Sequence, residues 1–235
     1  MKGFLLAGIA RVTLSSATRG ELPASQVAEA RARWSGAVEK LKARDAEEKH
    51  PEDSILFIGS STIRMWENIV QDMAPYHPIQ RGYGGAKYGD LVVFAEEMIS
   101  PHRCRAMVTF AGNAVLGKET DATPEQVAGC FRQIAAVARA REPNADVFCV
   151  AVTPTPARWN LWNRIQEVNA ALQAACAEDP KLHFVPTSES YLDVNGDSKP
   201  KPEFYEDDNL HFNKDGYVVW AGRVKAALRP VIGEK

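Results

Sequence analysis

The sequence lacks the cysteine and histidine patterns that hold metal ions or build disulfide frameworks. Its four cysteines are far apart and form no Cys-x-x-Cys pair, and its five histidines never occur at His-x-His or His-Glu-x-x-His spacing. Cys104 and Cys149 fall in apolar, strand-like runs, and Cys130 sits on an apolar helical face. We therefore expect small buried cysteine side chains, and neither disulfides nor a zinc site.

A strong charge excess and internal repeats are missing as well. The formal net charge is -2 and no basic run is present, so nothing indicates nucleic acid or an anionic membrane as a partner. No segment repeats, and none is of low complexity. The 235 residues, 45% of them apolar and 25% charged, suit one large soluble domain with a substantial core.

The first 22 residues partly match an export signal. Lys2 precedes a short apolar run over residues 3–10, and the small residues at 15–17 could form a cleavage site. Arg11 interrupts the apolar run, which is also too short for a transmembrane helix. The pattern favours a signal peptide, and with it a secreted or periplasmic location, over the disordered tail of a cytoplasmic protein. The folded domain is expected over residues 23–235.

From residue 25 onward, amphipathic helical patterns alternate with short, continuous apolar runs. The apolar periodicity predicts helices over residues 25–48, from Thr123 to about 137, over 160–177 and over about 217–228. The second of these has a complete start signal, because Thr123, Pro124 and Gln126 can form a capping box. The continuous runs predict buried strands at residues 55–58, 106–110, 147–152 and 183–185. This alternation indicates an α/β fold whose parallel sheet is covered on both faces, with a site at the carboxyl ends of its strands.

Candidate site residues follow the predicted strands. Ser61 comes directly after the strand at 55–58, where its hydroxyl would lie near a helix N-terminus that favours negative charge; a simple helix cap is the alternative. Three glycines within residues 82–85 allow the backbone to approach a ligand closely, as would a plain turn. Asn113 follows the strand at 106–110, and its amide could donate to an oxyanion, although asparagine is also a common turn residue.

A pair of acid and base residues precedes the last predicted helix. Asp208 and His211 are three residues apart, so within one turn the carboxylate can accept from Nδ1 and leave Nε2 free as a base. Asp207 is an adjacent rival for the same role. A solvated acidic turn with a surface histidine is the alternative interpretation.

In this order, the four segments resemble those of the SGNH hydrolases, also called GDSL hydrolases. The resemblance runs from about Trp34 to the end of the sequence. It is closest to the branch that reads Gly-Ser-Ser instead of Gly-Asp-Ser, here continued by Thr-Ile-Arg-Met-Trp up to residue 66, and residues 153–159 and 210–217 also look like this branch. More distantly, the layout is similar to the platelet-activating-factor acetylhydrolase α subunits. The resemblance implies a flavodoxin-like, three-layer α/β/α sandwich with a five-stranded parallel sheet.

The resemblance also implies roles for individual residues. The family's nucleophile falls on Ser61, its base on His211 and the orienting carboxylate on Asp208. The oxyanion donors fall on the backbone amides of Ser61 and Gly85 and on the side chain of Asn113. This chemistry needs no metal and no organic cofactor.

Two positions depart from the family pattern. The third segment usually reads Gly-x-Asn-Asp or Gly-Asn-Asp, whereas Ala114 follows Asn113 here and removes a carboxylate that would organise the loop. The second segment usually starts with Asn, and here Gln80 precedes Arg81. Neither change touches the three residues expected to be catalytic.

The implied activity is that of a serine esterase for short acyl esters, with acetyl favoured, on a small molecule or a carbohydrate. No lid-like apolar insertion is present, which disfavours long-chain lipase activity. The alternatives are a thioesterase or lysophospholipase-type enzyme and a non-catalytic carbohydrate-binding relative. Arg158 and Trp159 follow a strand end and could line the alcohol side of the site; alternatively, Trp159 and Trp162 anchor their helix in the core. The oligomeric state is not readable from the sequence.

Overall fold

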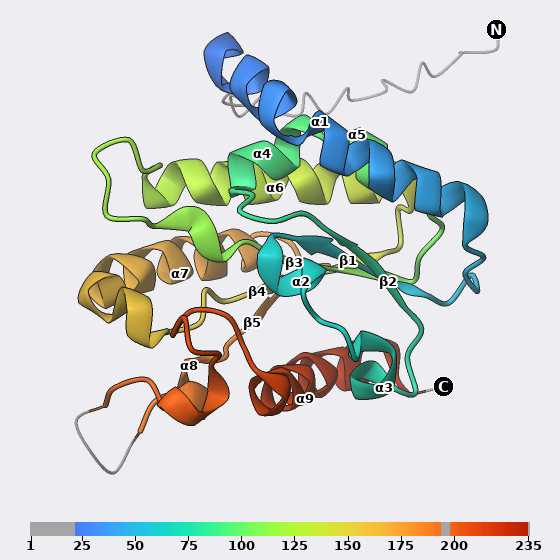
Figure 1. The fold of residues 1–235 in the computed structure, drawn as a ribbon. Coiled ribbons are helices and arrows are strands. Elements are labelled where there is room, and N and C mark those ends of the chain that lie inside the picture. Colours follow the sequence, from blue (N-terminus) through green and yellow to red (C-terminus); the bar gives the residue numbers. More distant parts are fainter. Residues whose placement is uncertain (1–21, 194–197, 235) are drawn as a thin grey trace, which may run out of the picture.

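A sheet of five parallel strands lies at the centre of the structure (Figure 1). The computed structural model describes residues 22–193 and 198–234, and the strand order is β2-β1-β3-β4-β5. The strands are β1 (Ile55–Gly59), β2 (Pro78–Gly82), β3 (Ala106–Phe110), β4 (Asp146–Val150) and β5 (Leu182–Val185). The predicted α/β fold with a five-stranded parallel sheet is confirmed. The candidate signal peptide falls almost wholly in residues 1–21, outside the described residues, and stays a prediction.

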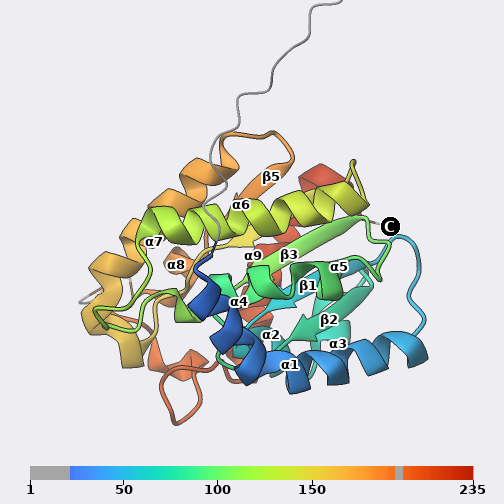
Figure 2. The same cartoon turned by 90° about the horizontal axis from the view of Figure 1, so that it is seen from above.

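Helices cover both faces of this sheet, which gives three layers (Figures 1 and 2). One face carries α1 (Ala24–Glu47), α4 (Tyr88–Val93), α5 (Ala95–Ile99), α6 (Pro124–Arg141) and α7 (Trp162–Cys176). The other face carries α3 (Ile69–Met73), α8 (Ser188–Tyr191) and α9 (Lys214–Ile232), and the short α2 (Ser61–Arg64) follows the end of β1.

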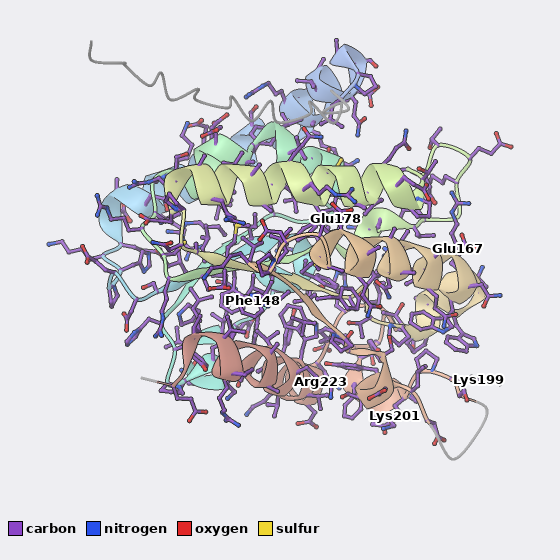
Figure 3. All side chains as sticks on the ribbon, turned by 180° about the vertical axis from the view of Figure 1, so that it is seen from behind. Phe148, Glu167, Glu178, Lys199, Lys201 and Arg223 are labelled. Carbon is purple, nitrogen blue, oxygen red and sulfur yellow. The ribbon has the colours of Figure 1, made fainter. Side chains whose placement is uncertain are left out.

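Side chains of each strand alternate between two hydrophobic cores. In β1, Leu56 packs with the first group of helices and Phe57 with the second. In β4, Phe148 lies in the interior between the sheet and α9, whereas Glu167 lies on the outer side of α7 (Figure 3). Both faces of the strands are therefore buried, which explains why their sequences read as continuous apolar runs.

Local capping sets the helix ends that the sequence predicts well. Thr123 Oγ1 accepts a bond from the Gln126 amide at 3.3 Å, and Gln126 Oε1 accepts one from the Thr123 amide at 2.9 Å, so the predicted capping box is confirmed. The helix expected from residue 160 instead begins at Trp162, because a 3₁₀ turn, η2 (Pro156–Leu161), precedes it and Arg158 there has non-helical angles.

The sequence patterns do not predict β2, α4 or α5. The strand β2 reads Pro-Ile-Gln-Arg-Gly, lies at the edge of the sheet, and uses polar side chains for its long-range contacts. Gln80 Nε2 donates to the carbonyls of Ile63 at 2.7 Å and Trp66 at 2.9 Å, which ties β2 to the residues that follow Ser61. The helices α4 and α5 have only 6 and 5 residues, too few for a clear apolar periodicity.

All four cysteines are buried and free, as expected. Within the part of the chain that the structure describes, no helix is long and apolar enough to cross a membrane.

A buried charge cluster joins the end of α1 to β2 and to the segment after α5. The Arg81 side chain is fully buried and donates to Asp45 Oδ1 at 2.6 Å and to Glu48 Oε2 at 2.7 Å. His102 is 6% exposed, and its Nε2 lies 3.3 Å from Asp45 Oδ1. Burial lowers the pKa of His102 to about 4; Asp45 opposes this shift, while Arg81 and His50 add to it.

The depressed pKa of His102 predicts that the protein loses stability as the pH falls from about 6.5 towards 4. The unfolded chain binds a proton at this histidine near its usual pKa, about 6.5, whereas the folded protein resists protonation until about pH 4. The free energy of unfolding should fall by about 2–3 kcal/mol over this range. Urea titrations at several pH values measure it. His102→Gln should remove most of the slope, and the matched change at the exposed His77 should keep it; equal slopes in both variants would contradict the assignment.

Candidate active site

A small cavity at the carboxyl ends of β1, β3 and β4 brings together most of the predicted site residues. Ser61 follows β1, Asn113 follows β3 in the 3₁₀ turn η1 (Gly112–Ala114), and Arg158 follows β4 in η2. The cavity volume is about 30 Å³, room for roughly two water molecules or a group of that size. Open parallel sheets bind their ligands at this edge.

Close backbone packing fixes the position of Ser61. A Cβ atom on Gly59 would clash with the Phe110 carbonyl oxygen, and one on Gly82 would lie 2.6 Å from the Arg64 amide nitrogen. The Ser60 amide donates to the same Phe110 carbonyl at 3.1 Å. Only glycine therefore allows the ends of β1 and β2 to approach β3 and α2 this closely, and Ser61 starts α2 directly above this junction.

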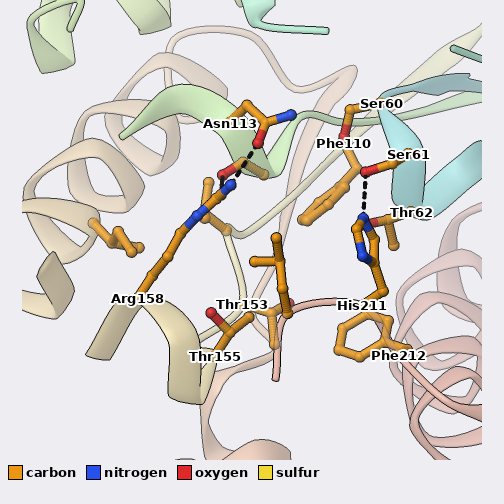
Figure 4. Close-up of a pocket in the computed structure, with 14 residues that line it drawn as sticks. Ser60, Ser61, Thr62, Phe110, Asn113, Thr153, Thr155, Arg158, His211 and Phe212 are labelled. Carbon is orange, nitrogen blue, oxygen red and sulfur yellow. Dashed lines mark hydrogen bonds between the residues drawn. The ribbon is translucent and has the colours of Figure 1, made fainter. Parts of the chain in front are cut away.

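Ser61, His211 and Asp208 form a continuous hydrogen-bonded chain. His211 Nε2 lies 3.0 Å from Ser61 Oγ, and His211 Nδ1 lies 2.5 Å from Asp208 Oδ2 (Figure 4 shows the first contact). A neutral imidazole with its proton on Nδ1 donates to the carboxylate and accepts from the serine hydroxyl. Ser60 lines the same cavity, but among the described residues its side chain makes no hydrogen bond to His211.

The turn before α9 selects Asp208 over its neighbour Asp207. Asp208 Oδ1 accepts from the amides of Leu210 and His211, both at 2.9 Å, while Oδ2 faces the imidazole. Burial alone would raise the pKa of Asp208, but the bonds from the His211 ring and from the two amides outweigh it and lower the pKa. The carboxyl group is therefore ionised at neutral pH and can orient and stabilise a protonated His211.

An aromatic contact connects the segment that follows Ser61 with the helix that follows His211. Trp66, fully buried after α2, stacks on Tyr217 in α9 with 5.5 Å between ring centres and 12° between planes. The Tyr217 hydroxyl also donates to the Thr62 carbonyl at 2.9 Å. Because Thr62 adjoins Ser61 and Tyr217 follows His211 by six residues, these contacts help to set the distance between the Ser61 and His211 side chains.

Asn113 and Arg158 form the other side of the cavity. Arg158 Nη2 donates to Asn113 Oδ1 at 2.6 Å, and Nη1 donates to the Gly112 carbonyl (Figure 4). Among the described residues the Asn113 Nδ2 group has no hydrogen-bond partner, so it remains available as a donor to a ligand. Burial lowers the pKa of Arg158 and the charge of Asp121 raises it, and the guanidinium remains charged at neutral pH.

Three predicted residues do not line this cavity: Asp208, which lies behind His211, and Gly85 and Trp159. Gly85 has a φ of +80°, packs against Trp34, and belongs to the neighbouring loop; its amide makes no hydrogen bond to another described residue. Trp159 stacks on Trp162 at 5.9 Å, and Trp162 packs against the core. The substrate-binding role of Trp159 and the oxyanion role of Gly85 stay predictions.

The structure adds cavity residues that the sequence does not single out. Phe110, Val152 and Ile165 are buried and form an apolar wall, and Thr155 lines the cavity with a buried hydroxyl that no described residue bonds. No sequence signal distinguishes them, because apolar residues at strand ends and a threonine in a Pro-rich loop are common everywhere. In the described ranges, no three His, Cys, Asp or Glu side chains gather in a way that could hold a metal ion.

The comparison with known families agrees with this geometry. The GDSL-like lipase/acylhydrolase family matches residues 16–219, and the chain belongs to this family. It is therefore a hydrolase of the GDSL, or SGNH, type.

Individual relatives are distant in sequence. The chain is 26% identical over 194 residues to the human platelet-activating factor acetylhydrolase IB subunit alpha1, covering 79% of this chain and 78% of that protein. A GDSL-like lipase from Bacteroides thetaiotaomicron superposes with a TM-score of 0.68 at 20% identity, covering 83% and 98% of the two chains. A family 3 carbohydrate esterase from Talaromyces cellulolyticus superposes with a TM-score of 0.56 at 16% identity, covering 77% and 98%. The two superpositions show a shared fold.

The close approach at Gly59 predicts that Gly59→Ala is strongly destabilising. The added methyl group meets the Phe110 carbonyl oxygen, which belongs to the neighbouring strand and cannot move aside without breaking sheet contacts. The expected loss is about 3 kcal/mol or more in the free energy of unfolding, measured by urea titration. As a control, Gly129→Ala in α6 meets no atom within 4 Å and should stabilise the protein by roughly 0.5–1 kcal/mol. Similar stabilities of the two variants would contradict the packing argument.

Proposed function

We propose that the protein is a serine esterase in which Ser61 is the nucleophile, His211 the general base and Asp208 the residue that orients the base. The observation that carries this proposal is the unbroken chain from Ser61 Oγ to His211 Nε2 at 3.0 Å and from His211 Nδ1 to Asp208 Oδ2 at 2.5 Å. A binding module would gain nothing from a base that is aligned on a hydroxyl group.

The reaction would proceed in two acyl-transfer steps. Ser61 Oγ attacks the ester carbonyl carbon while its proton passes to His211 Nε2. His211 then gives this proton to the leaving alcohol oxygen, and the acyl group remains bound to Ser61. A water molecule, deprotonated by His211, then attacks the acyl carbon. The bond from this carbon to Ser61 Oγ breaks, His211 returns the proton to Oγ, and the acid is released. During both steps Asp208 stabilises the imidazolium form of His211.

Three groups would stabilise the oxyanion: the backbone amides of Ser61 and Gly85 and the Asn113 side chain. Support comes from the unbonded Nδ2 group of Asn113, which lines the same cavity as Ser61 and His211 (Figure 4). Gly85 lies outside this cavity, and its part in the proposal follows from the family pattern alone. Pre-oriented donors of this kind stabilise the negative charge that develops on the carbonyl oxygen, and the loss of one typically lowers the rate by about 10²–10³-fold.

The proposed substrate is an acetyl or other short acyl ester of a small alcohol or a carbohydrate. Support comes from the cavity volume of about 30 Å³, which suits a small acyl group better than a long chain. The names of the relatives agree with this choice, because one is an acetylhydrolase and another a carbohydrate esterase.

The serine assignment predicts different outcomes at two adjacent positions. Ser61→Ala should abolish hydrolysis of p-nitrophenyl acetate with an unchanged thermal melting temperature, because the hydroxyl bonded to His211 is lost. Ser60→Ala should keep most of the activity, since its side chain makes no bond to the histidine. A fluorophosphonate should label the wild type and Ser60→Ala but not Ser61→Ala. An active Ser61→Ala variant would disprove the proposed mechanism.

The small cavity predicts a steep dependence on acyl-chain length. In a series of p-nitrophenyl esters, kcat/KM should be highest for acetate and fall sharply beyond butyrate, because longer chains do not fit against Phe110, Val152 and Ile165. Replacement of Val152 by Ala enlarges the cavity and should shift the preference towards longer chains. Efficient hydrolysis of dodecanoate by the wild type would refute the short-acyl assignment.

A further inference from the structure

The oxyanion loop lacks the carboxylate that usually follows its asparagine. Ala114 stands at that position; it is buried and lines no part of the cavity. Asn113 itself has φ and ψ of -89° and 20°, outside the helical region, in a turn of only three residues. Neither Gly112 nor Ala114 has a polar side chain that could hold the asparagine amide, so another segment must fix its orientation.

We propose that Arg158 is the positioning residue that holds the Asn113 amide in the orientation of an oxyanion donor. This inference rests on the function proposed above. The Arg158 Nη2 group donates to Asn113 Oδ1 at 2.6 Å, and Nη1 donates to the carbonyl of Gly112 in the same turn (Figure 4). The planar guanidinium thus binds one backbone oxygen and one side-chain oxygen of the loop, although Arg158 is 45 residues from Asn113 in the sequence.

The chemistry of the guanidinium decides which end of the amide faces the ester. An arginine side chain carries donors only, so it can hold only the oxygen of the Asn113 amide. Rotation of the amide by half a turn would set two donors against each other and lose this bond. The Nδ2 group is consequently left as the end that can reach a substrate oxygen, which is the donor that an oxyanion requires.

Arg158 is itself held in place by its surroundings. The Arg158 amide donates to the Thr155 carbonyl at 3.1 Å, and the charge of Asp121 partly counters the burial of the guanidinium. Asp121 Oδ2 accepts from the amides of Leu116 at 2.7 Å and Lys118 at 3.1 Å, in the loop directly after Asn113. Asp121 therefore orders the later part of the loop that contains Asn113, and Arg158 holds its first turn from a separate segment, so that together they supply the order that a carboxylate at position 114 would give.

A role through Asn113 predicts a specific kinetic pattern with p-nitrophenyl acetate. Asn113→Ala should lower kcat by about 10²-fold or more, and Arg158→Met should lower kcat by at least about tenfold, each with nearly unchanged KM, since the interaction matters only when charge develops. The double variant should be no slower than Asn113→Ala alone, because Arg158 acts through that residue. Arg158→Lys, with a single donor group, should recover part of the loss.

Control variants separate this role from a structural one. Asn113→Asp keeps an oxygen for Arg158 but lacks the donor, so it should fold with an unchanged melting temperature and still be slow. Arg164→Met, at an exposed position of α7, should leave kcat unchanged. If Arg158→Met fails to fold, the comparison of Arg158→Lys with Asn113→Asp carries the test.

Three results would overturn the inference. The first is a wild-type kcat and KM in Arg158→Met, and the second is a double variant in which the two losses in kcat multiply. The third is a raised KM with an unchanged kcat in Arg158→Met, which would mean that Arg158 contacts the alcohol part of the substrate instead. These failures differ from a failure of the proposed function. In that case Ser61→Ala would retain activity, or the wild type would neither hydrolyse the ester nor react with a fluorophosphonate, and the role of Arg158 would fall with it.

Discussion

The stacking of Trp66 on Tyr217 is the contact on which the active site depends most. Ser61 and His211 are 150 residues apart in sequence and lie in segments that share no secondary structure. The Trp66 ring also packs edge-on against Trp220 at 5.1 Å, so the segment after Ser61 and the first turns of α9 form one aromatic unit. Each such ring buries about 150–250 Å² of surface. This burial stabilises the arrangement of the two segments more than the single hydrogen bond between Ser61 and His211 could.

Much of the fold can be predicted because its determinants are local. The capping box at Thr123 and the continuous apolar run of β3 identify their elements from a few neighbouring residues. The strand β2 is not predicted because its side-chain hydrogen bonds are made by Gln80 and Arg81, and their partners lie in α2 and α1. A sequence window cannot show contacts of that range.

The candidate site also has parts that depend on neighbouring residues and parts that depend on long-range contacts. Asp208 and His211 can be paired from their spacing, but the choice against Asp207 depends on the turn geometry, in which Asn209 adopts a φ of +57°. The family pattern names Ser61 and Asn113, but the contact between Asn113 and Arg158 joins two loops with no sequence relationship. Position in a sequence predicts which groups are present, and only the packing of separate segments decides which of them meet.

The place of α9 in the fold has a consequence for the newly made chain. Ribosomes build the protein from its N-terminus, so all five strands are made before the helix that covers one face of the sheet. Until α9 arrives, Phe57, Val108 and Phe148 are covered only in part, by shorter segments such as α3 and α8, and this face offers an apolar surface of the kind that chaperones bind. His211 directly precedes that helix, so a chain stalled before it holds Ser61 without its histidine partner. Protection of the sheet and assembly of the candidate site thus coincide in one late event of synthesis.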